Sequence, residues 1–381
     1  MEFVPPSGWL SGLAFARNAL DATRCRTLLA LMSADTHTPS GHRRDKVVLV
    51  TGAGGEMGHG LIDALSRDGR QIVAIDVREL DAGVRSHCRD AFVGDICDAG
   101  LLERINAQFE IGEIFHLAAL LSTRGEFAPE TAHHVNVGGT LNLLKLAAEQ
   151  ARSHGQSVKF MFPSSIAAYG MPTLADKRAH PVVNEDQFTH AHTMYGVNKL
   201  AGEELGRYYQ SHYRKLAKDR HPSPIDFRSI RFPGIISSDT VPSGGTSDYG
   251  PEMIHVVAQG KAYDCFVRPD TRIPFMTMPE AIDALLRLAA APKEQLTRTV
   301  YNVSAFSPTA ADFERFVKQA FPGAQVSFQP DLGRQAIVDS WPEECDDSAA
   351  RRDWGWKPTY TFESAFEKYL MPKIHARYGH G

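Results

Sequence analysis

Short apolar runs alternate with amphipathic stretches along the chain after residue 45. The apolar runs have strand length and are rich in Val, Ile and Phe, and the stretches between them space their apolar residues as helices do. This alternation is typical of βαβ units, so we predict an α/β fold with a Rossmann-type, doubly wound parallel sheet. Strands are expected at 46–50, 71–76, 90–96, 113–119, 158–165 and 224–233, and helices at 58–69, 131–153 and 193–216.

The rhythm changes after Pro233, where a loop rich in Gly, Ser and Thr occupies 237–250. Amphipathic helices at 281–292 and 310–321 then flank a strand at 299–304. We therefore expect a smaller C-terminal substrate lobe that closes over the nucleotide fold, with the substrate between the two. The expected division is 1–45, an N-terminal extension or linker; 46–235, an NAD-binding domain that carries the catalytic residues; and 236–381, mainly the lobe, with some of the chain returning to the core.

Charge and composition exclude several classes of protein. The 381 residues include 41 Lys and Arg against 45 Asp and Glu, and the net charge of −4 gives no attraction for nucleic acid or membrane surfaces. No stretch reaches the ~18 consecutive apolar residues of a membrane span. The five cysteines are scattered and odd in number, which favours a reduced, intracellular protein.

The first 45 residues are the least typical part of the chain. Residues 8–32 place apolar side chains at near-helical spacing with Arg17, Arg24 and Arg26 between them. A mitochondrial presequence has this character, but Glu2 and Asp21 interrupt the pattern and serines are few. We favour a variable appendage, or a translation start upstream of the true one at Met32, and expect a cytoplasmic protein; the alternative is mitochondrial import.

A glycine-rich turn follows the first strand. Gly52, Gly55 and Gly58 form GxxGxxG between a strand and a helix, the context in which such glycines bring backbone amides to a pyrophosphate. Asp76 ends the second strand, 18 residues after Gly58, where a carboxylate accepts hydrogen bonds from ribose hydroxyls and repels a 2′-phosphate. NAD is therefore favoured over NADP, although Arg78 is close and a plain strand-end turn residue is the alternative. Asp95 ends the third strand, within reach of an adenine, on weaker grounds.

A second set of polar residues suits hydride-transfer chemistry. Ser165 ends a strand at the carboxyl edge of the predicted sheet, and Tyr195 and Lys199 lie one turn apart on a later helix. A tyrosine with pKa near ~10 is a poor base, but a neighbouring ammonium stabilises its phenolate. Tyr195 would then take a proton from a substrate hydroxyl that Ser165 holds in line. A lone YxxxK is usually two surface residues, and it is the joint occurrence with the glycine turn that favours catalysis.

These motifs carry a family resemblance. GxxGxxG, HLAA (116–119), PSSIAAYG (163–170) and YGVNK (195–199) resemble the extended short-chain dehydrogenase/reductase superfamily, which shares its fold with UDP-galactose 4-epimerase. HLAALLS (116–122), RSIRFPGIIS (228–237), GGTSDYG (244–250) and DDSAARRDWGW (346–356) are similar to the L-threonine 3-dehydrogenases of that superfamily. The resemblance covers the chain from Val47 to about Leu370.

The resemblance implies NAD-dependent oxidation of the 3-hydroxyl of L-threonine to 2-amino-3-oxobutanoate. It implies Tyr195 as base, Lys199 as its activator and ribose ligand, and Ser165 as the third catalytic member. The implied NAD-binding residues are Gly52, Gly55, Glu56, Met57, Gly58, Asp76, Asp95, Ile96, Leu117, Ala118, Ala119, Asn136, Tyr195, Lys199, Pro233 and Ile235. The implied substrate residues are Ser122, Ser165, Tyr195, Gly245 and Thr246, and a homodimer is implied as well.

Two departures from the family pattern leave rivals open. Ser165 stands where the family is expected to have threonine, which keeps the hydroxyl, and Arg124 stands where a small residue is usual. A cation there could retune recognition, so the alternatives are another small hydroxy-acid dehydrogenase or a nucleotide-sugar epimerase. A non-catalytic NAD sensor is disfavoured by the intact Ser165, Tyr195 and Lys199. We expect no metal, because the sixteen histidines lack partners at zinc-like spacing.

Overall fold

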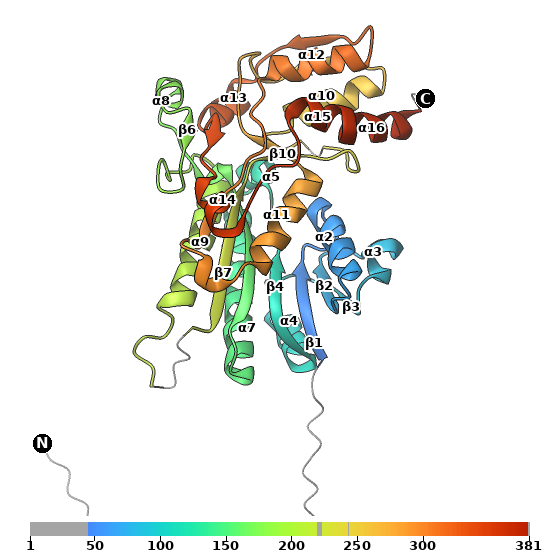
Figure 1. The fold of residues 1–381 in the computed structure, drawn as a ribbon. Helices are drawn as coiled ribbons and strands as arrows, with labels where there is room; N and C mark the ends of the chain where they lie inside the picture. The colour runs from blue at the N-terminus through green and yellow to red at the C-terminus, as the bar shows by residue number, and fades with distance from the viewer. Residues whose placement is uncertain (1–44, 219–222, 243, 380–381) are drawn as a thin grey trace, which may run out of the picture. The chain divides into compact units, whose positions relative to one another are not determined.

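The computed structural model describes residues 45–218, 223–242 and 244–379. Its centre is a sheet of seven parallel strands in the order β11-β7-β5-β4-β1-β2-β3 (Figure 1). This confirms the predicted α/β, doubly wound architecture. The strands are β1 (Asp45–Thr51), β2 (Ile72–Asp76), β3 (Asp90–Val93), β4 (Phe109–His116), β5 (Val158–Ser165), β7 (Ile225–Phe232) and β11 (Val300–Asn302).

Helices cover both faces of the sheet, which is why its inner strands are almost uninterrupted apolar runs. One face packs Leu61, Ile62 and Leu65 of α2 against Leu285 and Leu288 of α11. The other face buries apolar side chains of α4 and α7 against β1, β4 and β5, and α9 contacts β5 and β7. These helices and the short α3 are α2 (Glu56–Arg67), α3 (Ala82–Ser86), α4 (Ala99–Gln108), α7 (Gly139–His154), α9 (Met194–Ser211) and α11 (Met278–Ala290).

A second apolar core lies beyond the carboxyl ends of the strands, where Figure 1 shows α10, α12, α15 and α16 grouped. Its centre is aromatic, with Tyr249, Phe275, Phe313 and Phe362 packed edge to face. The elements of this region are α8 (Leu174–Ala179), β6 (Val182–Val183), β8 (Gly234–Ile236), α10 (Tyr249–Ala258), β9 (Tyr263–Cys265), β10 (Phe275–Thr277), α12 (Ala310–Ala320), β12 (Val326–Phe328), α13 (Leu332–Asp339), β13 (Glu344–Cys345), α15 (Phe362–Ala365), η4 (Phe366–Leu370) and α16 (Met371–Tyr378).

The chain after residue 235 does not stay in this second core. β11 pairs with β7 as the edge strand of the central sheet, and α11 packs on α2. The connecting elements are η3 (Lys293–Gln295) and α14 (Ser348–Trp354). Residues 45–381 accordingly form one compact unit, and the expected N-terminal extension lies outside the described residues.

Two expected helices differ in their details. The stretch at 131–153 is divided into α6 (Pro129–His133), a π-helical turn η1 (His134–Gly138) and α7, and the side chain of Asn136 within η1 is hydrogen-bonded to the backbone of Leu120. The helix expected over 193–216 ends at Ser211. Between the strands lie two further short elements, α5 (Ser122–Phe127) and η2 (Ile166–Ala168).

Within the described residues, no helix has the length and apolar character needed to cross a membrane.

Candidate active site

The glycine turn has the geometry that the sequence predicts. Gly52 has a φ of +68°, and a Cβ on it would lie 2.6 Å from the backbone nitrogen of Ala118. A Cβ on Gly58 would lie 2.4 Å from the carbonyl oxygen of Ala53, so only glycine lets α2 pack this closely on the turn. Gly55 is the N-cap of α2 and offers no side chain to its first amides. The amino end of α2 is therefore open to an anion such as a pyrophosphate.

Asp76 faces this turn from the end of β2. Its Oδ2 accepts a hydrogen bond from the backbone nitrogen of Gly54 (2.9 Å) and its Oδ1 accepts one from that of Arg78 (3.0 Å). The residue is 9% exposed, so its carboxylate is fixed beside the turn while the Arg78 side chain is exposed. A carboxylate held in this way can accept ribose hydroxyls and repels a 2′-phosphate.

The other expected cofactor residues border the same edge of the sheet. Ile96 is buried against Gly139, where a Cβ would lie 2.3 Å from its Cδ1, and Asp95 is exposed with its Oδ1 accepting from the Cys97 backbone nitrogen. Asn136 uses its amide on Leu120, accepting from the backbone nitrogen (2.8 Å) and donating to the carbonyl (3.0 Å). The Asn136 side chain thus fixes the backbone at Leu120, the residue that follows Leu117, Ala118 and Ala119.

Ser165 and the first turn of α9, which carries Tyr195, both contact Ala167. The Ser165 Oγ accepts a hydrogen bond from the Ala167 backbone nitrogen (3.1 Å) at the end of β5. On the next position of α9 after Tyr195, a Cβ on Gly196 would lie 1.9 Å from the Ala167 carbonyl oxygen. The first turn of α9, which begins with Met194 and Tyr195, therefore lies directly on the segment that follows Ser165 at the carboxyl end of β5.

Two side chains fix the first turn of α9. Thr193 is its N-cap and accepts from the Gly196 backbone nitrogen (3.1 Å), while the Glu126 Oε1 accepts from the Met194 backbone nitrogen (2.8 Å). Such caps satisfy amides that have no partner within the helix. The sequence pattern predicted the helix but not Glu126, because the two segments are 68 residues apart.

Lys199 lies one turn further along α9. Its Nζ donates to the carbonyl oxygen of Pro163 (2.6 Å) and lies 5.3 Å from the centre of the Tyr195 ring. Burial lowers the pKa of Lys199 to about 8, against the opposing charge of Glu203. Burial also raises the pKa of Tyr195 above its usual range. Tyr195 can therefore act as a base only where a positive charge stabilises its phenolate, and Lys199 is the side chain placed to supply it.

The expected substrate residues are brought together beside Tyr195. The Thr246 hydroxyl donates to the Ser122 Oγ (3.2 Å), and a Cβ on Gly125 would lie 3.8 Å from the Tyr195 backbone nitrogen. The Thr123 hydroxyl donates to the Gly244 carbonyl (2.7 Å). Two hydrogen bonds therefore connect α5 to the loop before α10.

Arg334 of α13 holds the same loop from its other side. Its guanidinium donates to the Gly245 carbonyl (2.7 Å) and stacks on the ring of Phe266. Arg124 of α5 is exposed, while Pro233 is buried and Ile235 lies in β8, paired with Met276 of β10. Arg334 was not among the expected site residues, since its partner Gly245 is 89 residues away along the chain.

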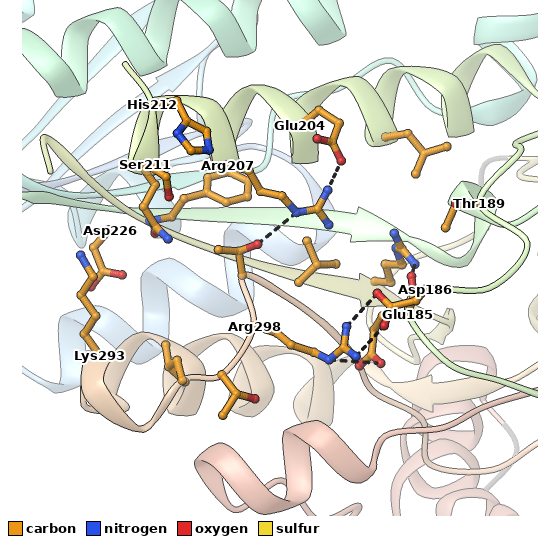
Figure 2. A pocket seen from close by; sticks show the side chains of 18 residues that line it. Glu185, Asp186, Thr189, Glu204, Arg207, Ser211, His212, Asp226, Lys293 and Arg298 are labelled. Atoms are coloured by element: carbon orange, nitrogen blue, oxygen red, sulfur yellow. Dashed lines mark hydrogen bonds and ion pairs between the residues drawn. The ribbon is translucent and has the colours of Figure 1, made fainter. Parts of the chain in front are cut away.

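A large polar cleft lies elsewhere, beside the second half of α9. Its volume is about 650 Å³, and its lining includes none of the expected catalytic, cofactor or substrate residues. Figure 2 shows two ion pairs at this cleft, Arg207 with Glu204 and Arg298 with Asp186. The lining holds four basic and four acidic residues, so the cleft has no excess of either charge to select a ligand. Over the described parts of the chain, no group of three His, Cys, Asp or Glu residues is placed to hold a metal ion.

Comparison with known proteins gives one family and a consistent set of relatives. The model of the NAD dependent epimerase/dehydratase family matches residues 48–304. The mitochondrial L-threonine 3-dehydrogenase of Bos taurus is 36% identical over 330 residues, covering 86% of this chain and 82% of its own. The holo structure of the GalE-like L-threonine dehydrogenase from Cupriavidus necator matches with a TM-score of 0.73 and 34% identity, covering 86% and 99% of the two chains. A monomeric L-threonine 3-dehydrogenase from a metagenome matches with a TM-score of 0.75 and 35% identity, covering 87% and 99%.

Proposed function

We propose a function from the premise that the chain belongs to the NAD dependent epimerase/dehydratase family: it is an oxidoreductase of the L-threonine 3-dehydrogenase type. It oxidises the 3-hydroxyl of L-threonine to 2-amino-3-oxobutanoate with a nicotinamide cofactor. The observation that carries this proposal is the placement of Ser165, Tyr195 and Lys199 at the sheet edge above the glycine turn. Relatives named as L-threonine 3-dehydrogenases, alike over most of the chain, support the choice of substrate.

The proposed mechanism assigns one task to each of three side chains. The Ser165 hydroxyl holds the substrate hydroxyl in line with Tyr195, whose phenolate accepts the proton. The Lys199 ammonium, with its Nζ 5.3 Å from the centre of the Tyr195 ring, stabilises that phenolate. NAD, when bound, accepts the hydride from the carbon that carries the hydroxyl.

The residues present fit a dinucleotide. Gly55 leaves the amino end of α2 without a side-chain cap, Gly52 and Gly58 let the turn and helix pack closely, and Asp76 is held beside them by two backbone amides. We propose NAD in preference to NADP because a fixed carboxylate at this position repels a 2′-phosphate. Glu56 and Met57, the Leu117-Ala118-Ala119 turn anchored by Asn136, Asp95 with Ile96, and Pro233 with Ile235 would complete the contact.

Ser122, Gly245 and Thr246 would bind the amino-acid part of the substrate. The hydrogen bonds from Thr246 to Ser122 and from Arg334 to Gly245 hold these residues in a loop next to the first turn of α9. Arg124 departs from the family pattern in the same helix as Ser122. Its exposed guanidinium makes another small hydroxy-acid the alternative substrate class.

We also propose a homodimer and a cytoplasmic location. Phe127 of α5 and Val197 and Tyr208 of α9 are exposed apolar side chains that a second copy would cover. One relative is named as monomeric, so light scattering of the purified protein is the test.

The bovine relative is named as a mitochondrial protein, and the N-terminal segment that would decide the compartment lies outside the described residues. Mitochondrial import of a reporter fused to residues 1–45 would contradict the cytoplasmic location and favour a mitochondrial one.

NADH formation at 340 nm across a panel of substrates tests the catalytic proposal. L-threonine should give the highest kcat/KM, ahead of L-serine, L-allo-threonine and small hydroxy-acids. A hydroxy-acid that exceeds L-threonine would favour the alternative that Arg124 suggests. Absence of net NADH release, with cofactor retained in stoichiometric amount, would instead indicate an epimerase.

A further inference from the structure

Tyr195, Lys199 and Glu203 lie at successive i, i+4 positions on one face of α9. Glu203 has no exposed surface, and its carboxylate is fully hydrogen-bonded. Its Oε1 accepts from the Ser164 hydroxyl (2.6 Å) and from the Arg231 Nε (2.9 Å), and its Oε2 accepts from the Arg231 Nη2 (2.7 Å). The carboxylate is therefore bonded to a guanidinium and a hydroxyl and fixed one turn away from Lys199.

Arg231 is as firmly held as its partner. It is 1% exposed, donates to the Glu185 carbonyl (2.7 Å) and lies over the ring of Tyr169, with its Cζ 4.8 Å from the ring centre. A buried ion pair of this kind adds little net stability compared with apolar residues of the same volume. Its position next to the active site points to a role in setting charge there.

Lys199 needs such a charge. Its ammonium is buried, and burial favours the neutral amine. Its Nζ donates to the Pro163 carbonyl, and in the described part of the chain Lys199 forms no direct ion pair with Glu203. The ammonium is thus stabilised from a distance while its remaining protons stay available to the site.

The other titratable groups around Lys199 cannot replace Glu203. His116 of β4 is buried with its pKa lowered to about 3, so it is neutral. His133 of α6 is hydrogen-bonded to Asn198, the residue before Lys199, and a histidine carries no negative charge. The Arg231 guanidinium opposes a second positive charge nearby. The Tyr195 hydroxyl does not favour an ammonium until its phenolate forms. Among the described residues, Glu203 is the carboxylate that raises the pKa of Lys199.

We propose that Glu203, fixed by Arg231 and Ser164, is a positioning residue that keeps Lys199 in its ammonium form. The inference rests on the proposed function only for its catalytic consequence. Glu203 touches neither substrate nor cofactor; it acts through Lys199, and Ser164 ties it to the strand end that also presents Ser165.

The polar cleft beside α9 supplies a matched control. Figure 2 shows Arg207 and Glu204 at this cleft, and the Arg207 Nη2 lies 3.7 Å from the Glu203 Oε2. Glu204 is the next residue of the helix and has a side chain 71% exposed. Glu204→Gln therefore removes the same charge from the same turn, but from the solvent side.

The direct experiment titrates Lys199 by NMR in protein labelled with ¹³C at the lysine Cε, the signal being assigned with Lys199→Arg. In Glu203→Gln the pKa of Lys199 should fall by at least about one unit relative to wild type, because burial is then unopposed. Glu203→Asp keeps the charge and should restore most of the shift, and Glu204→Gln should leave the wild-type value. An unchanged pKa in folded Glu203→Gln, or an equal fall in Glu204→Gln, would overturn the proposal.

Two further measurements keep the proposal testable. If Glu203→Gln does not fold, the wild-type titration decides, because Lys199 that is neutral at pH 7 would contradict a stabilising carboxylate. In turnover, Glu203→Gln should lose kcat at pH 8 by about fivefold or more, because a pKa that falls from about 8 by one unit leaves about a tenth of Lys199 as the ammonium. The loss should diminish at lower pH, where Lys199 regains its proton. Since the titration needs no substrate, a fall in the pKa without any threonine turnover would refute the proposed function alone.

Discussion

Replacing Gly196 with alanine tests how α9 positions Tyr195, the proposed catalytic base. The added Cβ would lie 1.9 Å from the Ala167 carbonyl oxygen and 2.8 Å from the Cβ of Ala191. A carbon and a carbonyl oxygen approach to about 3.3 Å, so the two backbones must separate by more than about 1 Å. Because the opposing atom belongs to the backbone, no side-chain rotation relieves the contact.

Both stability and catalysis should respond. Overpacking of this kind costs about 1–3 kcal/mol of the free energy of unfolding, which lowers Tm by about 1–4 °C in a unit of this size. A displacement of about 1 Å between Tyr195 and Ser165 should reduce kcat by about 10²-fold. The measurements are thermal unfolding and NADH formation from L-threonine at saturating NAD.

Gly206→Ala separates the two effects. A Cβ on Gly206 would lie 2.2 Å from the ring of Phe227, so it overpacks the same helix three turns away from Tyr195. This variant should lose a similar amount of stability and keep most of its kcat. Retention of wild-type kcat within about twofold by folded Gly196→Ala would refute the proposed dependence on this contact, given the about 10²-fold loss expected.

Three other changes give independent predictions. Asp76→Ala should raise the KM for NAD by about tenfold or more and leave that for NADP no worse, because a charged hydrogen-bond acceptor is lost; equal loss for both cofactors would contradict the ribose role. Arg334→Met should raise the KM for L-threonine without changing that for NAD, because its bond to the Gly245 carbonyl is lost; an unchanged KM would show that the loop does not depend on it. Burial lowers the pKa of His116 to about 3. Between that pH and about 6.5, His116 therefore binds a proton in the unfolded chain but not in the folded one. The free energy of unfolding should therefore fall as the pH drops below about 6.5, by up to about 1.4 kcal/mol per pH unit, and His116→Asn should lack this part of the slope in denaturant titrations; equal slopes would contradict it.

Local steric and hydrogen-bonding rules made much of the fold predictable. Gly52 and Gly58 are fixed by contacts with the adjoining turn, and such contacts follow from a strand–turn–helix sequence. The buried strands appear as apolar runs because helices cover both faces. The helix α4 was not predicted, although Asp98 caps it by accepting from the backbone nitrogens of Gly100 and Leu101. That capping residue before an apolar pattern was a usable signal.

Other features depend on partners that are distant in the sequence. The π-helical turn at 134–138 accompanies the bonds of Asn136 to Leu120, and no periodicity marks it. Glu203 lies on the predicted helix, but its importance appears only when Arg231 and Ser164 are brought to it by the sheet. Residue spacing within one element was therefore informative, while bonds between elements required the three-dimensional arrangement.

In the proposed mechanism, Tyr195 removes the proton from the 3-hydroxyl of L-threonine. The most direct measurement compares NADH formation by wild type and Tyr195→Phe with L-threonine at saturating NAD, alongside NAD binding by each protein. We expect turnover by wild type and a loss of at least about 10²-fold in the variant, with NAD binding retained. Turnover by Tyr195→Phe at a rate close to wild type, or none by wild type with L-threonine, would contradict it.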